Sequence, residues 1–143
     1  MKMDVYSGRL RLNGEEHQST LRAALNYAST LSELQRFKEA KSLLRKTMPV
    51  ARRVLSESDE LSIRMRSLYA QSLYMGDGAT LDDLRESVAR LEELTRTTRR
   101  VLGDSHPLVD DIKRDLQRSR TALRASETQP PKTFAPGWLD GPS

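Results

Sequence analysis

The sequence of 143 residues has no cysteine, few aromatic residues and no long apolar segment. Without cysteine, the chain cannot form a disulfide and offers neither a thiol nucleophile nor a thiolate ligand for zinc. Aromatic residues make up 5% of the chain, so few side chains are available to stack on nucleic-acid bases. No segment approaches the roughly 18 consecutive apolar residues of a membrane-spanning helix. The sequence therefore predicts no membrane partner.

The N-terminal segment, MKMDVYSGRL, lacks the apolar core of a signal peptide. Together with the missing cysteine, this favours a cytosolic or nuclear setting, and we take the cytoplasm as the expected location. Charged residues make up 31% of the chain, with 24 Lys and Arg against 20 Asp and Glu. A net charge of +4 that is spread over both signs predicts solubility, and does not by itself predict nucleic-acid binding.

The segment 14–55 contains two patterns of apolar residues at the three-and-four spacing of amphipathic helices. A turn near Gln35 and Arg36 separates them, and two helices joined by so short a turn must lie antiparallel. Pro49 lies inside the second pattern and predicts a kink without a break. The apolar positions of the first helix are Leu21, Ala24, Leu25, Ala28, Leu31 and Leu34, and those of the second are Phe37, Ala40, Leu43, Leu44, Met48, Ala51 and Val54.

The same pattern returns further along the chain. Ile63, Ala70 and Leu73 each lie 42 residues after an apolar position of the first helix, and a constant shift is typical of a structural repeat. The second helices are related by a shift of 47 residues, so the second copy holds five extra residues near its Gly76-Asp77-Gly78 turn. His106 and Pro107 open a third copy that lacks its second helix. Its one helix carries more charge between its apolar positions, which is typical of a capping helix.

These patterns predict an all-α solenoid of antiparallel helix pairs. The segment 1–12 reads as the end of a truncated repeat, with a frayed N-terminal arm as the alternative. The segment 127–143 is rich in Pro, Gly, Thr and Ser, which predicts a disordered tail. The predicted units are therefore 1–12, repeat 1 at 13–55, repeat 2 with its insertion at 56–102, a capping helix at 103–126 and the tail at 127–143.

Four short motifs of the first unit resemble tetratricopeptide repeats of the kinesin light chain type, whose unit has roughly 42 residues. The chain is also similar to repeat-rich open reading frames of unicellular algae. The resemblance implies an α-solenoid with a general role in binding proteins. The matching residues are Gly14, His17, Thr20 and Leu21, then Asn26 and Ala28, then Arg36, Phe37, Glu39 and Ala40, and finally Arg53, Val54 and Leu55.

The second unit departs from that family pattern. Ser56 and Asp59 replace the glycine and histidine of the first motif, and Leu68 stands where the first unit has Asn26. No heptad coiled coil, with which a light chain grips a motor heavy chain, is present. The resemblance therefore carries over the fold and a binding role, without a motor association.

Residues that could carry catalysis or bind a metal are scarce. His17 and His106 are the only histidines, and they occupy equivalent positions before a helix start, where a structural role in the turn is expected. Asp82-Asp83 and Asp110-Asp111 lie in first helical turns, where acids favour the helix dipole, so a capping role is the favoured interpretation. Gly103 is expected to end the helix that precedes it. The glycine-rich turn lacks the Lys-Ser/Thr of a phosphate loop. We predict no enzyme, no metal site and no cofactor.

The helix at 36–55 has seven basic residues and one acid, Glu39, for a net charge of +6. A solvated outer face is the favoured interpretation, because second helices line the convex side of such solenoids. The alternative is electrostatic binding of nucleic acid or of an acidic protein. The basic residues are Arg36, Lys38, Lys41, Arg45, Lys46, Arg52 and Arg53.

The predicted partner-binding face is the polar stripe that each first helix presents next to its core stripe. Arg22 and Arg64 lie one repeat apart and could converge on a carboxylate of an extended peptide. The alternative is that all these residues are ordinary surface residues. The predicted face consists of Arg22, Asn26, Ser29 and Glu33 in repeat 1, and of Arg64, Ser67, Gln71 and Tyr74 in repeat 2.

Two further expectations concern the ends of the chain. A solenoid needs about three repeats to bury its faces, so the chain is expected to associate with itself or to form part of a longer array. Light-chain-like repeats recognise peptides with a tryptophan flanked by acids, and Trp138-Leu139-Asp140 is a partial version. The tail is therefore a candidate ligand for the concave groove.

Overall fold

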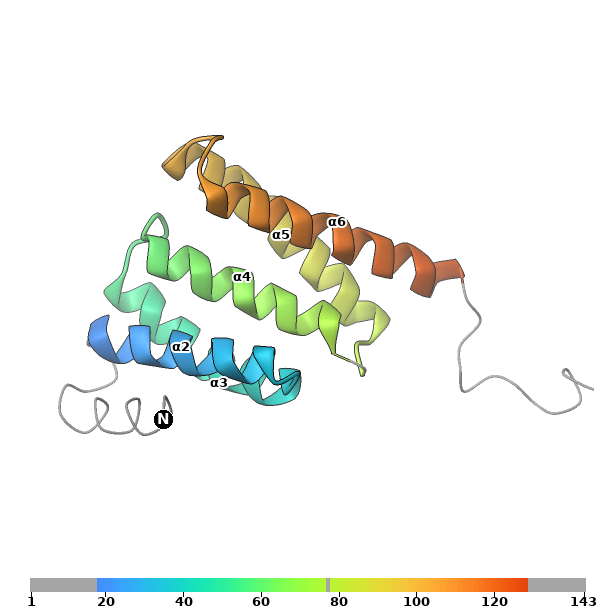
Figure 1. Ribbon diagram of the computed structural model, residues 1–143, viewed down its shortest axis with the longest axis horizontal. Helices are drawn as coiled ribbons and strands as arrows, with labels where there is room; N and C mark the ends of the chain where they lie inside the picture. The colour runs from blue at the N-terminus through green and yellow to red at the C-terminus, as the bar shows by residue number, and fades with distance from the viewer. Residues whose placement is uncertain (1–17, 77, 129–143) are drawn as a thin grey trace, which may run out of the picture.

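The computed structural model describes residues 18–76 and 78–128, which form five helices joined by short turns (Figure 1). No strand occurs in these two segments, so the predicted all-α class is confirmed. The predicted segment 1–12, His17, the tryptophan motif and residues 129–143 of the predicted tail 127–143 lie outside the described residues, whereas residues 127 and 128 belong to the last helix. The helices are α2 (Gln18–Glu33), α3 (Phe37–Val54), α4 (Glu60–Met75), α5 (Leu81–Leu102) and α6 (Pro107–Thr128).

The helices form two layers. Each helix packs against its neighbour in sequence, and α4 also contacts both α2 and α6. The first helices, α2, α4 and α6, therefore lie side by side in one layer, and α3 and α5 form the other (Figure 1). The predicted antiparallel pairs of a helical repeat are confirmed. No helix in the described segments is long and apolar enough to cross a bilayer.

Apolar residues at the repeat spacing form the core. The positions related by the shift of 42 residues are all buried: Leu21, Ala28 and Leu31 are 0–2% exposed, and so are Ile63, Ala70 and Leu73. Burying one Leu or Ile side chain contributes roughly 1.5–3 kcal/mol. The two copies share these apolar positions because each copy buries them against its neighbouring helices.

Helix α4 contributes to two clusters. Leu61, Met65 and Tyr69 pack with residues of α2 and α3, whereas Ile63 and Ala70 pack with residues of α5 and α6. A helix that is covered on two sides buries residues around most of its circumference. The sequence predicted one apolar stripe on this helix, whereas the structure buries a wider part of its surface.

Two residues of the predicted apolar stripes are exposed. Leu34 is 60% exposed because α2 ends at Glu33 and the chain has already entered the turn. Val54 is 38% exposed as the last residue of α3. Both predictions were wrong because an apolar pattern does not indicate where a helix ends. Pro49, by contrast, lies on an exposed face of a continuous α3, so the predicted absence of a break is confirmed.

Capping residues define the start and end of α5. The Thr80 hydroxyl accepts a hydrogen bond from the Asp83 amide, and the Asp83 carboxylate accepts one from the Thr80 amide, both at 3.0 Å. This capping box lowers the pKa of the Asp83 carboxyl. At the other end, Gly103 has a φ of 88°, a conformation that glycine adopts without strain. The capping role predicted for Asp83 and the helix stop predicted at Gly103 are confirmed.

Candidate partner-binding groove

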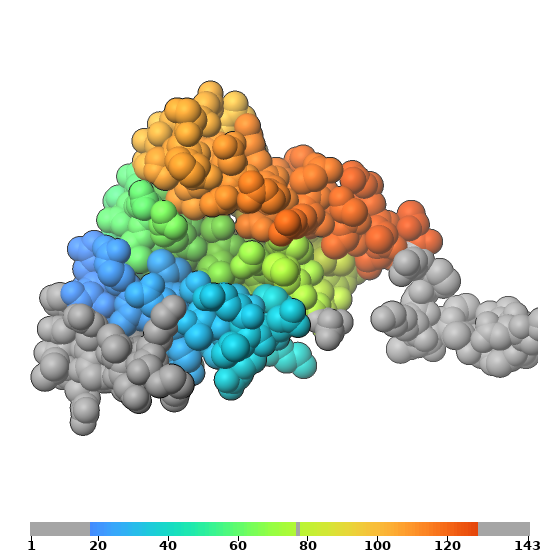
Figure 2. Space-filling view, in the orientation of Figure 1, coloured from blue at the N-terminus to red at the C-terminus, as the bar shows by residue number. Residues whose placement is uncertain are grey.

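A groove with a volume of about 680 Å³ runs across the layer of first helices. Figure 2 looks onto this face, where α4 lies between α2 and α6. The walls combine charged, polar and apolar side chains from all three helices. The lining residues are Arg22, Leu25, Asn26 and Ser29 of α2, Asp59 and then Glu60, Leu61, Arg64, Ser67, Leu68 and Gln71 of α4, and Leu108, Asp111, Arg114, Asp115 and Arg118 of α6.

Most residues of the predicted binding face line this groove. Glu33 and Tyr74 do not, since Glu33 is the exposed last residue of α2 and Tyr74 is half-buried against α6. The one-repeat spacing therefore brings residues of α2 and α4 to one groove. The six residues that line it are Arg22, Asn26, Ser29, Arg64, Ser67 and Gln71.

The arginines of the groove differ in whether they already have a carboxylate partner. Arg64 forms an ion pair with Glu60 at 3.0 Å, and Arg114 forms one with Asp111 at 3.2 Å. Each pair lies on one exposed helix surface, where such pairs contribute roughly 0.3–0.5 kcal/mol. Arg22 forms no ion pair with any residue in the described segments. Arg22 is thus a groove cation that can bind a ligand without breaking an ion pair of the described segments.

The third helix supplies a buried carboxylate. Asp115 is 9% exposed and accepts a hydrogen bond of 2.6 Å from the Tyr74 hydroxyl. Burial raises the pKa of the Asp115 carboxyl, and burial together with this bond raises the pKa of the Tyr74 phenol. Tyr74 therefore ties α4 to α6 beside the groove and uses its hydroxyl for that contact.

The pKa of Asp115 predicts a pH-dependent effect of Asp115→Asn. The folded protein binds the carboxyl proton more tightly than the unfolded chain, in which the pKa is near 3.8. The ionised carboxylate therefore opposes folding at neutral pH, and this opposition disappears as the pH falls through the folded-state pKa. We expect Asp115→Asn to have the higher free energy of unfolding at pH 7, with a difference that shrinks toward pH 4. Urea titrations at several pH values measure it, and a difference independent of pH would contradict the assignment.

The groove residues of α6 were not predicted from the sequence, because α6 was expected to serve only as a capping helix. A signal was present: the shift of 47 residues seen in the second helices also relates Arg64 to Asp111 and Leu68 to Asp115. Applying it to the first helices would have found them. The missed groove residues of α6 are Leu108, Asp111, Arg114, Asp115 and Arg118.

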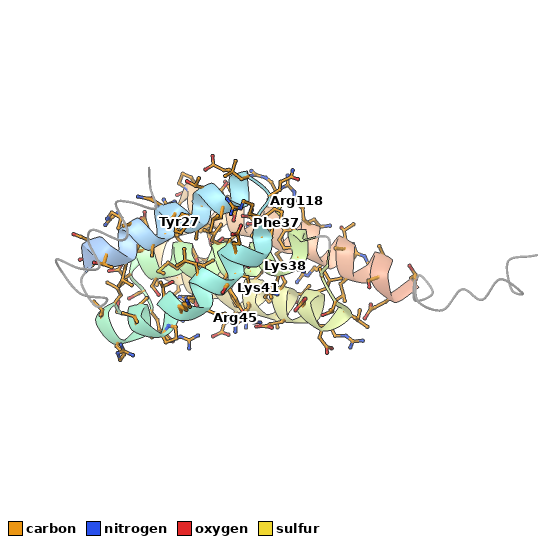
Figure 3. All side chains as sticks on the ribbon, turned by 90° about the horizontal axis from the view of Figure 1, so that it is seen from below. Tyr27, Phe37, Lys38, Lys41, Arg45 and Arg118 are labelled. Atoms are coloured by element: carbon orange, nitrogen blue, oxygen red, sulfur yellow. The ribbon has the colours of Figure 1, made fainter. Side chains whose placement is uncertain are left out.

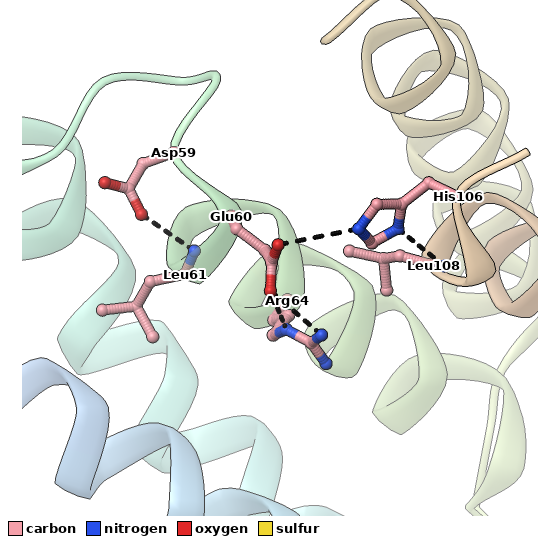
Figure 4. Close-up of polar contacts among 6 residues, drawn as sticks. All are labelled: Asp59, Glu60, Leu61, Arg64, His106 and Leu108. Carbon is pink, nitrogen blue, oxygen red and sulfur yellow. Dashed lines mark hydrogen bonds and ion pairs between the residues drawn. The ribbon is translucent and has the colours of Figure 1, made fainter. Parts of the chain in front are cut away.

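The turns before α4 and before α6 make equivalent contacts (Figure 4). The Asp59 carboxylate accepts a hydrogen bond of 2.9 Å from the Leu61 amide, and His106 Nδ1 accepts one of 3.1 Å from the Leu108 amide. His106 Nε2 also lies 3.8 Å from a carboxylate oxygen of Glu60. The structural role predicted for His106 is confirmed. Its ring nitrogen accepts a backbone hydrogen bond at the start of α6, as the Asp59 carboxylate does at the start of α4.

Replacing His106 by alanine is expected to lower the free energy of unfolding by about 0.5–2 kcal/mol, the usual loss for a helix cap. His106→Asp should restore most of the loss because a carboxylate makes the same contact at α4. Urea unfolding of the two variants measures the effect. Equal stability of the alanine and aspartate variants would show that the accepted hydrogen bond contributes nothing.

The basic helix α3 lies in the second layer, and Figure 3 shows Lys38, Lys41 and Arg45 following one another along it. Arg36, the residue before α3, forms an ion pair with Glu39 in the first turn of the helix. Arg45 Nε donates a hydrogen bond of 3.2 Å to the Tyr69 hydroxyl of α4. Part of the positive charge on α3 is therefore used in contacts within the protein.

Among residues 18–76 and 78–128, no three His, Cys, Asp or Glu side chains form a group that could hold a metal ion.

Residues 20–59, which cover α3 and nearly all of α2, match the family model described as tetratricopeptide repeat. The fold is of the tetratricopeptide repeat type. No curated protein and no solved structure matches the chain. Tetratricopeptide repeats generally mediate interactions between proteins, and the family is typically a non-catalytic scaffold.

Proposed function

We propose that this chain is a non-catalytic scaffold that binds an extended peptide or a partner helix in the groove of α2, α4 and α6. The observation that supports it is the convergence of six residues, selected by their repeat spacing, on one groove of about 680 Å³. Concave sites that combine apolar walls with a few polar groups are the usual ligand sites of proteins. The organisation into units 13–55, 56–102 and 103–126 belongs to this proposal.

The groove favours a ligand with an acidic residue near α2. Arg22 is exposed there and offers a planar guanidinium that can bind a carboxylate through two hydrogen bonds. One helical turn further on, Asn26 offers an amide that can both donate to and accept from a peptide backbone. Leu25 and Leu68 supply apolar surface in the same groove. We therefore infer a peptide that carries an acid next to an apolar side chain.

The resemblance to kinesin light chain repeats supports the same class of ligand, since such repeats recognise tryptophan flanked by acids. We also propose that the protein is located in the cytoplasm. Self-association of the chain would add a further repeat surface against which the helices could pack. Binding of polyanions through α3 stays a prediction of the sequence.

Filling the groove tests the proposal. Ser67 lies on α4 between the two outer helices, and Ser67→Tyr places a large side chain where the peptide would lie. We expect at least about tenfold weaker binding of fluorescent peptides with a tryptophan between acids, measured by anisotropy. Lys46→Tyr, on the exposed surface of α3, is the matched control and should bind normally. Equal binding by both variants would overturn the assignment of the groove.

A further inference from the structure

A second, smaller cavity of about 150 Å³ lies between α3, α4 and α5. It shares no lining residue with the groove of the first helices. Three arginines from three successive helices line it: Arg52 of α3, Arg66 of α4 and Arg90 of α5. Burial lowers the pKa of Arg66, and the positive charges of Arg52 and Arg90 at the same cavity lower it further.

Arg66 has a hydrogen-bond donor that the fold leaves without a partner. Its Nη2 donates a hydrogen bond of 2.8 Å to the backbone carbonyl of Glu57, which holds the side chain in place. Its Nε is buried and has no hydrogen-bond partner in the described segments. A buried donor without an acceptor costs about 1–3 kcal/mol, and more when it is charged. An acceptor in the cavity would remove that cost.

Arg90 is held in a fixed orientation at the same cavity. Its Nε donates a hydrogen bond of 2.7 Å to Glu86, and its guanidinium lies over the Tyr69 ring, 4.9 Å from the centroid. Arg52 is exposed and forms no ion pair within the described segments. The cavity thus combines two restrained guanidinium groups with one that is free to close over a ligand.

We propose that this cavity binds a phosphate group, either as inorganic phosphate or as a phosphorylated side chain. Arginine forks match the oxygen atoms of phosphate, and three of them face one cavity. The volume of about 150 Å³ compares with ~30 Å³ for one molecule of liquid water, so a tetrahedral anion fits together with a few waters. Ser62, a buried residue of the lining, adds a hydroxyl.

Two carboxylates at the cavity limit its expected affinity for phosphate. Glu57 and Glu93 are exposed residues of the lining, and their negative charges raise the pKa of Arg66 as a bound anion would. They compete with a phosphate and limit its affinity. Removing one of them should therefore strengthen phosphate binding, whereas removing an arginine should weaken it.

The test is a calorimetric titration of the full chain with inorganic phosphate at constant ionic strength. Arg52→Ala is expected to weaken binding at least about tenfold, because charged hydrogen bonds are lost. Glu93→Gln should strengthen it, and Lys46→Ala, which removes a cation elsewhere on α3, should leave it unchanged. No saturable phosphate binding, or equal losses in Arg52→Ala and Lys46→Ala, would overturn the proposal.

A parallel titration with O-phosphoserine separates the two sources. Binding at least as tight as that of inorganic phosphate would assign the cavity to a phosphorylated side chain, and exclusion of phosphoserine would assign it to the free ion. Ser67→Tyr should leave both titrations unchanged, because the groove lies elsewhere. The two proposals can therefore fail independently.

Discussion

Ile63→Ala is expected to lower the free energy of unfolding by about 2–5 kcal/mol, the usual range for removing a large aliphatic side chain from a core. Ile63 is 0% exposed and joins α4 to the cluster formed with Leu91 and Ile112. Because α4 is covered on both sides, the cavity cannot close by movement toward solvent. Urea unfolding followed by helical circular dichroism measures the loss.

Leu34→Ala is the matched control, since it removes the same kind of side chain from a position that is 60% exposed. Its effect should remain within about 0.5 kcal/mol, as for most surface substitutions. A loss for Ile63→Ala that is no larger than that of Leu34→Ala would contradict the packing of α4 between two clusters. It would also contradict the repeat alignment, in which Ile63 occupies the buried position that Leu21 has in the first copy.

Arg22→Glu is expected to weaken binding of an acidic peptide in the groove at least about tenfold, because a cation that attracts the ligand becomes an anion that repels it. Arg64→Glu should have a smaller effect than Arg22→Glu, since Arg64 already neutralises Glu60 at 3.0 Å. Fluorescence anisotropy with the peptide series used for Ser67→Tyr measures both variants. The loss of affinity should therefore be larger for Arg22→Glu than for Arg64→Glu.

A charge-swapped peptide provides the control. Replacing the peptide acids by lysines should restore binding to Arg22→Glu and weaken binding to the wild type. Unchanged helical circular dichroism would show that the variant is folded, as expected for an exposed residue of α2. Equal losses for the two arginine variants would instead support the convergence of both side chains on one carboxylate.

The repeat spacing explains why so much of the fold was predictable. Leu21, Ala28 and Leu31 recur as Ile63, Ala70 and Leu73, and a constant shift of 42 residues is expected when both copies pack in the same way. The short turns at Gln35 and Gly103 then require antiparallel neighbours. Local chemistry also indicated Asp83 as a capping residue, because that contact involves residues close in sequence.

Periodicity was therefore enough to predict the all-α class, the helix pairs and the position of Arg22 and Arg64 on one face. Whereas the pair of Arg64 with Glu60 is local to α4, the tertiary structure was needed to show that Asp115 and Tyr74, which are 41 residues apart in the chain, form a hydrogen bond. It also decided the arginine cavity, whose members come from three helices. Periodicity places a residue on a face, but its burial and its contacts with distant residues depend on neighbours from other helices.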